Sequence, residues 1–320
     1  MRVGIIGTGF AAHLRAEALR DDGRATLVGV AGHHFNKAQA VATEFGAEAY
    51  ASWTDLLHEA NLDLVCICTV NRDHGQMTRA ALNLGLHVVV EYPLSLELDD
   101  AQGLVKLAQE RRQLLHVEHI ELLSGVHLLL HREVPGLGEI FSASYSTLTA
   151  TRPAPERWTY SPDLFGFPLV GAVSRIHRMV DLFGPVASVS CQARFDGSDM
   201  PHRYASCLCA AQLNFVSGLQ ATVTYGKGES IWRSQRTLEI NGHRGGILIE
   251  GEQAVLLRPD GAHALDVGSR RGLFYQDTHM VLDHLFHDQP LYVKTEQMLH
   301  ALAVGVAAEQ SAKTQAWVKL

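Results

Sequence analysis

The start of the chain carries residues whose types and spacing suit the binding of a dinucleotide. The stretch is Gly4-Ile5-Ile6-Gly7-Thr8-Gly9-Phe10-Ala11-Ala12, an apolar run that leads into a G-x-G-x-x-A pattern. Gly7 permits a tight turn, Gly9 lets the backbone approach a pyrophosphate, and Ala12 keeps the following helix close to the strand. Because a helix beginning near Phe10 directs unpaired N–H groups at phosphates, we expect the pyrophosphate to bind at its first turn.

The end of the second predicted strand indicates which nicotinamide cofactor is bound. In sites that prefer NAD, an acidic residue at this place accepts hydrogen bonds from the ribose 2′-OH. Here the strand is followed by Gly32-His33-His34-Phe35-Asn36-Lys37, which holds no carboxylate. Lys37 attracts a 2′-phosphate, as does His33 or His34 when it is protonated or donates a hydrogen bond. We therefore expect NADPH in preference to NADH, with the alternative that these three residues only face solvent.

Tyr92, Arg175 and Arg178 are further candidates for chemistry, and it is the family resemblance described below that implies they form one site. Arginine stays protonated in proteins and tyrosine titrates near 10, so none of the three is a good base at neutral pH. Guanidinium groups and an aromatic plane suit an anionic, flat, conjugated substrate instead, and they favour reduction over alcohol oxidation. The two arginines are three apart on a predicted helix and can converge on one ligand. In the alternative interpretation, Arg175 only pairs with Asp181 or another carboxylate, Arg178 is likewise structural, and Tyr92 only packs.

Charge and composition exclude several classes of protein. The 320 residues include 27 Lys and Arg against 34 Asp and Glu, a formal net charge of −7, so we expect no nucleic-acid partner. No apolar run reaches the roughly 20 residues of a membrane span and no export signal begins the chain, which predicts a cytoplasmic protein without a membrane partner.

The five cysteines include two C-x-C pairs. A zinc site at these pairs is conceivable, but buried reduced thiols are favoured and we expect no metal.

The elements that must position these residues divide the chain in two. Residues 1–118 alternate short apolar runs with amphipathic stretches, which predicts an α/β domain with a doubly wound parallel Rossmann sheet. Its ligand is expected at the carboxyl ends of the strands. After the first strand, the predicted strands are 26–31, 62–69, 87–91 and 114–117, and the predicted helices are 36–45, 52–59, 74–84 and 95–112.

Residues 119–320 predict an α+β substrate-binding domain built on a mostly antiparallel sheet. The predicted helices are 122–132 and 171–183, and the predicted strands are 208–215, 220–225, 237–241, 246–250 and 253–257. Turn signals such as Ser217-Gly218 separate the strands at hairpin spacing. An alanine-rich periodic stretch, 296–310, predicts a C-terminal helix that packs back on the body. The open face of the sheet can pair with another subunit, which leaves both a homo-oligomer and a monomer open.

Several segments resemble the Gfo/Idh/MocA oxidoreductase family. They are the strand-end run Asp63 to Asn71, the downstream His74, and Glu91-Tyr92-Pro93 in place of the family's E-K-P motif. The family pairs that lysine with a D-x-x-x-H-x-x-D helix. In this chain Tyr92 replaces the lysine, Ser174 the Asp and Arg178 the His, while Asp181 is kept. The resemblance implies a hydride-transferring enzyme that has exchanged proton acceptors for fixed positive charge.

Other segments resemble the cyanobacterial biliverdin reductases within that family. They are Glu91-Tyr92-Pro93-Leu94, residues 116–123, 157–160, 165–170 and 268–274. The resemblance implies NADPH-dependent reduction of the central methine bridge of biliverdin IXα to bilirubin, with Tyr92, Arg175 and Arg178 catalytic. The implied cofactor contacts are Gly7, Thr8, Gly9, Phe10, Ala11, Ala12, Gly32, His33, His34, Lys37, Thr69, Val70, Asn71, His74, Glu91 and Tyr92. The implied substrate contacts are Tyr92, His119, Glu121, Ser174, Arg175 and Arg178.

Two other functions fit parts of the pattern. A sugar or polyol dehydrogenase of the same family fits the fold, but the missing lysine and histidine count against it. A regulator that binds NADPH or bilin without catalysis also fits the loss of the usual catalytic residues.

Overall fold

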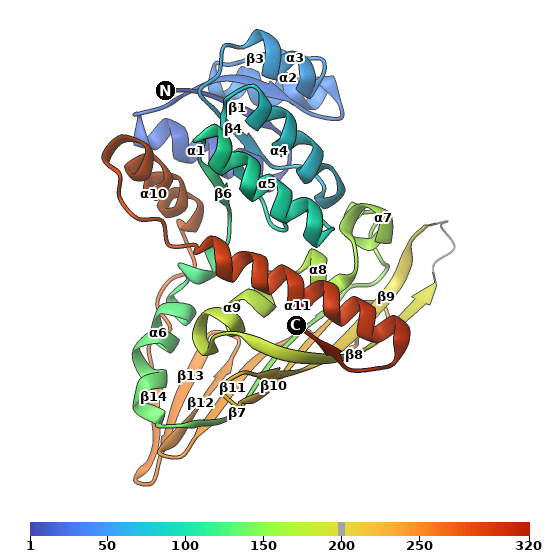
Figure 1. Cartoon of the computed structure of the whole chain (residues 1–320), viewed down its shortest axis with the longest axis vertical. Coiled ribbons are helices and arrows are strands. Elements are labelled where there is room, and N and C mark those ends of the chain that lie inside the picture. The colour runs from blue at the N-terminus through green and yellow to red at the C-terminus, as the bar shows by residue number, and fades with distance from the viewer. Residues whose placement is uncertain (198–201) are drawn as a thin grey trace. The chain divides into compact units, whose positions relative to one another are not determined.

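The computed structural model describes residues 1–197 and 202–320, and it divides them into two compact units (Figure 1). The first unit comprises residues 1–123 and 271–295, and the second comprises residues 124–270 and 296–320. The predicted division differs in that it assigned everything after residue 118 to the second domain.

The first unit is a doubly wound α/β domain, as predicted. Its parallel sheet has the strand order β3-β2-β1-β4-β5-β6, so the order reverses between β1 and β4. The carboxyl ends of these two strands therefore form the switch point at which such sheets bind ligands. The strands are β1 (Arg2–Ile6), β2 (Thr26–Ala31), β3 (Glu48–Tyr50), β4 (Leu64–Ile67), β5 (His87–Val90) and β6 (Leu115–Val117).

Buried aliphatic side chains of the sheet and of the surrounding helices form the core of this unit. Val3 and Ile5 of β1 are inaccessible to solvent, as are Val30 of β2 and Ala12 of the first helix. The helices are α1 (Phe10–Asp22), α2 (Phe35–Phe45), α3 (Trp53–Glu59), α4 (His74–Asn83), α5 (Leu98–Arg111) and α10 (Leu273–His287), with the short helices η1 (Asn71–Asp73) and η2 (Ile120–Leu122).

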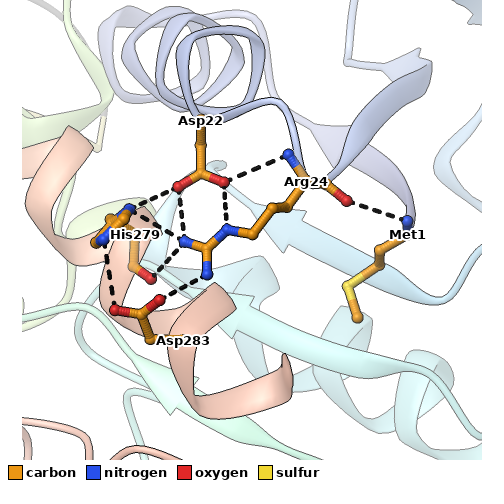
Figure 2. Close-up of polar contacts among 5 residues, drawn as sticks. All are labelled: Met1, Asp22, Arg24, His279 and Asp283. Carbon is orange, nitrogen blue, oxygen red and sulfur yellow. Dashed lines mark hydrogen bonds and ion pairs between the residues drawn. The ribbon is translucent and has the colours of Figure 1, made fainter. Parts of the chain in front are cut away.

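Helix α10 belongs to the first unit because polar and apolar contacts fix it there. Figure 2 shows Arg24 donating hydrogen bonds to Asp22 at the end of α1 and, over 2.6 Å, to Asp283 of α10. His279 of α10 lies 2.7 Å from Asp22, whose pKa is lowered to about 2, chiefly by its hydrogen bond from Arg24. Val281 and Leu282 of the same helix join the hydrophobic core. A segment remote in sequence thus completes the Rossmann unit.

The second unit is built on a mixed, mostly antiparallel sheet, as predicted. Among the described residues its strand order is β14-β13-β12-β11-β7-β10-β9-β8-β15, and only β7 and β10 pair in parallel. The strands are β7 (Ile140–Ala150), β8 (Val186–Gly197), β9 (Tyr204–Phe215), β10 (Gln220–Gly228), β11 (Gln235–Gly242), β12 (Gly245–Glu250), β13 (Gln253–Arg258), β14 (Gly261–Leu265) and β15 (Val318–Lys319).

Helices of the second unit cover one face of this sheet (Figure 1). The long C-terminal helix is held against β8, since His300 accepts a hydrogen bond from the Val186 N–H and Ser311 accepts one from the Cys191 N–H. The helices are α6 (Gly125–Glu133), α7 (Pro162–Phe165), α8 (Pro168–Gly171), α9 (Ser174–Phe183) and α11 (Thr295–Thr314), with η3 (Val134–Leu137) and η4 (Trp158–Tyr160). No helix among the described residues has the length and apolar character needed to span a membrane.

Candidate active site

The glycine loop of the first unit has the geometry of a pyrophosphate cradle. Gly7 adopts a φ of +138°, and a Cβ there would collide with the Cys68 carbonyl oxygen, so only glycine fits. Gly9 caps α1 without a side-chain hydrogen bond, and a Cβ on it would meet nothing within 4 Å. The first turn of α1 therefore presents N–H groups beside open space, which suits a dinucleotide. Thr8, Phe10, Ala11 and Ala12 complete the loop, with Phe10 77% exposed and Ala12 buried.

The predicted 2′-phosphate contacts lie together at the start of α2. His34 is the N-cap residue of that helix, and His33, His34 and Lys37 are all exposed after Gly32. The structure adds a carboxylate that sequence reasoning missed, because His33 Nε2 lies 3.4 Å from Asp73 Oδ2. Asp73 also accepts a 3.1 Å hydrogen bond from Arg72, so a further cation stands at the same place.

His74 positions the loops that follow β4 and β5. Its Nδ1 lies 2.8 Å from the Pro93 carbonyl oxygen and its Nε2 lies 3.3 Å from the Thr69 carbonyl oxygen. Burial lowers the pKa of His74, which keeps the ring neutral. Because a neutral ring carries one N–H, the shorter contact to Pro93 is the hydrogen bond we assign. His74 thus ties the Thr69-Val70-Asn71 turn to the loop that carries Tyr92, and the role is one of positioning.

Tyr92 lies on His119 in the first unit. The two rings are stacked with centroids 5.2 Å apart and planes inclined by 12°. His119 is buried, whereas Tyr92 and the nearby Glu121 are partly exposed. Two of the predicted substrate residues therefore meet in one aromatic pair, which offers a flat surface to a conjugated ligand.

A buried charged cluster lies behind this aromatic pair, and sequence reasoning missed it. Arg15 of α1 forms an ion pair with Asp277 of α10, which also lies 2.7 Å from His116 and accepts a 2.6 Å hydrogen bond from Tyr292. Burial opposes charge on Asp277, but Arg15 and His116 hold the pKa of this carboxyl below its usual range. Arg15 and His116 each lie more than 150 residues from Asp277 in the sequence, so no local pattern could reveal these two contacts.

Glu91 points its carboxyl into the same cluster. Its Oε1 lies 3.8 Å from Arg15 Nη2, and its carboxyl also shares a hydrogen bond with Glu118. Burial raises the pKa of Glu118, and the charge of Glu91 raises it further, so Glu118 keeps its proton and donates to Glu91. The Glu91 carboxyl is engaged inside the unit. The predicted contact of Glu91 with the cofactor therefore falls to its backbone.

Helix α9 of the second unit carries the two predicted catalytic arginines. Arg178 is 2% exposed, and it donates to the Tyr145 hydroxyl over 3.3 Å and to the Ser124 hydroxyl over 3.2 Å. Arg175 is partly exposed and donates to the neighbouring Ser174 hydroxyl over 3.1 Å. Their guanidinium carbons lie 5.4 Å and 5.3 Å from the ring centroids of Tyr145 and Tyr225, respectively. Aromatic rings of the sheet thus hold both cations in place.

Lys227 is a third cation near α9, and sequence reasoning missed it. It lies on β10, the strand that also carries Tyr225. Its ammonium group donates to the Thr159 carbonyl oxygen and lies 4.2 Å from the centroid of Phe165 and 4.7 Å from that of Tyr160. Burial lowers the pKa of Lys227 to about 8. The rings of Tyr204 and Tyr225 complete an aromatic cage around the ammonium group. One lysine in a β-strand gives no sequence signal of this cage, because its rings come from η4, α7, β9 and β10.

The family models match both parts of the chain. The NAD-binding Rossmann-fold model of the Gfo/Idh/MocA oxidoreductases matches residues 1–119, and the model of their C-terminal alpha/beta domain matches residues 135–320. The chain therefore belongs to the Gfo/Idh/MocA oxidoreductase family. The predicted fold and family are confirmed.

Individual relatives narrow this assignment. A crystal structure of biliverdin reductase from Synechocystis sp. PCC 6803, in complex with biliverdin and NADP+, is 46% identical, with a TM-score of 0.95 over 98% of this chain and 99% of that one. Human biliverdin reductase A is 28% identical over 261 residues, which are 81% of this chain and 78% of the human protein. UDP-N-acetylglucosamine 3-dehydrogenase from Acidithiobacillus ferrooxidans is 20% identical, with a TM-score of 0.79 over 98% of each chain, and this likeness shows the fold alone.

Proposed function

We propose that this chain is an NADPH-dependent biliverdin reductase that converts biliverdin IXα to bilirubin. One observation carries the proposal: the likeness at 46% identity, over 98% of the chain, to an enzyme crystallised with biliverdin and NADP+. The buried Arg178 supports it, since α9 offers a fixed cation where a sugar dehydrogenase needs a base.

The cradle of the first unit fits the cofactor. Gly7 and Gly9 leave the first turn of α1 open to a pyrophosphate. Lys37 and Arg72 supply positive charge for a 2′-phosphate, against the Asp73 carboxylate that pairs with Arg72. NADPH supplies a hydride when bound. Thr69, Val70, Asn71 and Tyr92 follow strand ends at the carboxyl edge of the sheet, where ligands of such folds bind, and His74 fixes their loops.

The arginines of α9 bind the substrate and stabilise its charge. Biliverdin carries two propionates, which guanidinium groups bind through paired, charge-assisted hydrogen bonds. Transfer of a hydride to the central methine carbon pushes electron density onto a pyrrole nitrogen, which then takes a proton from water or from a hydrogen-bonded guanidinium group. A cation held in a buried site stabilises that charge more strongly than one in water, which assigns this role to Arg178. The more exposed Arg175 is assigned to a propionate, and Tyr92 with His119 to stacking on the tetrapyrrole.

The test is to mix the purified chain with biliverdin and NADPH and to record the visible spectrum. The proposal expects the long-wavelength biliverdin band to fall while a bilirubin band grows. A shifted bilin band without turnover would replace the proposal with a binding regulator. An unchanged bilin spectrum, together with NADP+-dependent oxidation of a sugar or polyol, would replace it with a dehydrogenase.

We also propose a cytoplasmic location and leave a homo-oligomer as a prediction. Cys66, Cys191, Cys207 and Cys209 are buried, and all five cysteines are free thiols, as a reducing compartment favours. The outer face of the sheet exposes Leu208, and it is the surface through which a second copy would pack. The mass of the chain in solution, measured by light scattering, tests the oligomer.

A further inference from the structure

Two helices of the second unit bring together three side chains of metal-ligand type that the proposed function does not use. His127 and His131 lie four residues apart on α6, so they project from one face of that helix. Asp181 reaches them from α9, and its Oδ2 lies 2.8 Å from His127 Nε2 and 2.6 Å from His131 Nε2. The two Nε2 atoms are 3.1 Å apart. All three ligand atoms thus converge on one point.

We propose that His127, His131 and Asp181 form a binding site for a divalent transition-metal ion with the coordination preferences of Zn²⁺. Two imidazole nitrogens and one carboxylate oxygen match a three-ligand zinc site, whereas Mg²⁺ and Ca²⁺ require mostly oxygen ligands. Tetrahedral bonds of about 2.0–2.2 Å separate ligand atoms by roughly 3.3–3.6 Å. The observed separations of 2.6–3.1 Å therefore have to open by roughly 0.2–1.0 Å, most of all between Asp181 and the half-exposed His131 side chain.

The burial of the three side chains suits entry of an ion from solvent. The His127 side chain is 2% exposed and that of Asp181 is 14% exposed, while half of the His131 side chain faces solvent. Two ligands are thus fixed in the protein and the third closes over the ion. A water molecule can complete the tetrahedron from the open side.

The protonation states at neutral pH also suit a metal. Metal binding requires neutral imidazoles and an ionised carboxylate. Burial lowers the pKa of His127. Burial opposes the charge of Asp181, but hydrogen bonds from the two histidines hold the pKa of this carboxyl at about 2.

Two features of the surroundings limit the affinity of this site for a metal ion. The Arg178 guanidinium lies close enough to His127 to lower the pKa of that ring, so it also repels a cation. Nδ1 of His127 has no hydrogen-bond partner in the described structure, and the outer-shell acceptor that strengthens zinc sites about 10- to 100-fold is absent there. We therefore expect micromolar rather than nanomolar binding. A bound ion would link α6 to α9, the helix that carries Arg178.

The test is a titration of the chelator-treated, untagged full chain with Co²⁺, which reports tetrahedral coordination through visible absorption. Wild-type protein should bind one equivalent of Co²⁺, and added Zn²⁺ should displace the bound Co²⁺. His131→Asn, at a half-exposed position, should weaken binding at least 30-fold, and Asp181→Asn should do the same. The matched control is His263→Asn, which removes an exposed histidine 3.1 Å from Asp260 in the same unit and should bind like wild type.

Zn²⁺ provides a second readout that is independent of spectroscopy. It should raise the melting temperature of wild type and of His263→Asn but leave that of His131→Asn unchanged. The proposal is overturned if wild type shows no tetrahedral band, or if His131→Asn binds Co²⁺ as tightly as wild type. Because neither readout uses biliverdin or NADPH, failure here is separate from failure of the proposed reductase activity.

Discussion

The glycine loop of the first unit and helix α9 of the second, which carries Arg175 and Arg178, differ in which groups they offer to a ligand: the loop offers backbone groups and the helix offers side chains. At the loop, the proposed contacts come from the backbone: Gly7 takes a conformation that side chains avoid, and Gly9 leaves space over α1. At α9, the proposed contacts come from side chains, and Arg175 and Arg178 lie over the rings of Tyr225 and Tyr145. We propose that the backbone-built region serves any dinucleotide, whereas the side-chain-built region selects the substrate.

The largest expected effect tests the side-chain-built region at Arg178. Arg178→Met keeps most of the volume of the side chain but removes the cation, so kcat/KM for biliverdin should fall by about 10²–10³-fold. Steady-state kinetics with NADPH measure this, and circular dichroism checks the fold. The control is Arg194→Met, which removes an arginine 82% exposed in the same unit and should leave the kinetics unchanged. Wild-type turnover together with undiminished bilin affinity in Arg178→Met would refute the assigned role.

The next effect tests the backbone-built region at Gly9. Gly9→Val places its Cβ in the open space over α1, where no atom of the chain lies within 4 Å, so NADPH affinity should fall by about 100-fold while the melting temperature changes little. Fluorescence titration of NADPH and thermal melting measure the two quantities.

A contrasting variant sharpens the result at Gly9. Gly7→Val must strain the backbone at a φ of +138° and meet the Cys68 carbonyl, so it should lower both affinity and stability. If Gly9→Val bound NADPH normally, the pyrophosphate would not lie at this turn.

A pH dependence of stability tests the aromatic cage around Lys227. The pKa of this buried lysine is about 8 in the folded chain, against 10.5 for the unfolded group. The unfolded chain therefore binds more protons between these values, and stability rises with pH across this window. Between pH 8 and pH 10 the free energy of unfolding of wild type should rise by about 2 kcal/mol relative to that of Lys227→Met. Urea unfolding at both pH values measures the difference, and parallel curves would contradict the lowered pKa.

The smallest expected effect concerns a side chain in the otherwise backbone-built region. Lys37→Gln removes an exposed cation at the start of α2, so the ratio of kcat/KM with NADPH to that with NADH should fall by roughly fivefold to tenfold. Lys106→Gln, on the exposed surface of α5, serves as the control. A preference for NADH in wild type would show that the cations near the 2′ position do not select the phosphate.

Much of the fold could be predicted because it follows from local patterns. The predicted strand 26–31 has the bounds of β2, and the predicted helix 74–84 differs from α4 by one residue. The pattern does not predict β7, the strand that pairs with β10 and β11 inside the large sheet. Its sequence Ile-Phe-Ser-Ala-Ser-Tyr-Ser-Thr-Leu-Thr-Ala has too many small polar residues for a clear hydrophobic alternation, although Tyr145 and Thr147 face the interior.

In the candidate site, too, some residues could be predicted from local spacing and others could not. Residues near one another in sequence, such as Gly7 and Gly9 or His33 and Lys37, could be named from spacing. The partners that hold Arg178 and Lys227 could not, because Tyr145, Ser124 and Thr159 carry no local signal of the contact they make. The predicted alternative for Asp181 was a pairing with Arg175, whereas the contacts of its carboxyl in the structure include both histidines of α6.

The sequence by itself determined the Rossmann unit, the glycine cradle, the family and the replacement of the family's lysine by Tyr92 and of its histidine by Arg178. These features depend on backbone conformation and on short-range spacing, which a linear pattern records. Only the tertiary structure decided that α10 completes the first unit through Arg15 and Asp277, and that His127, His131 and Asp181 converge. Such clusters depend on where distant segments meet, and burial then sets their charges.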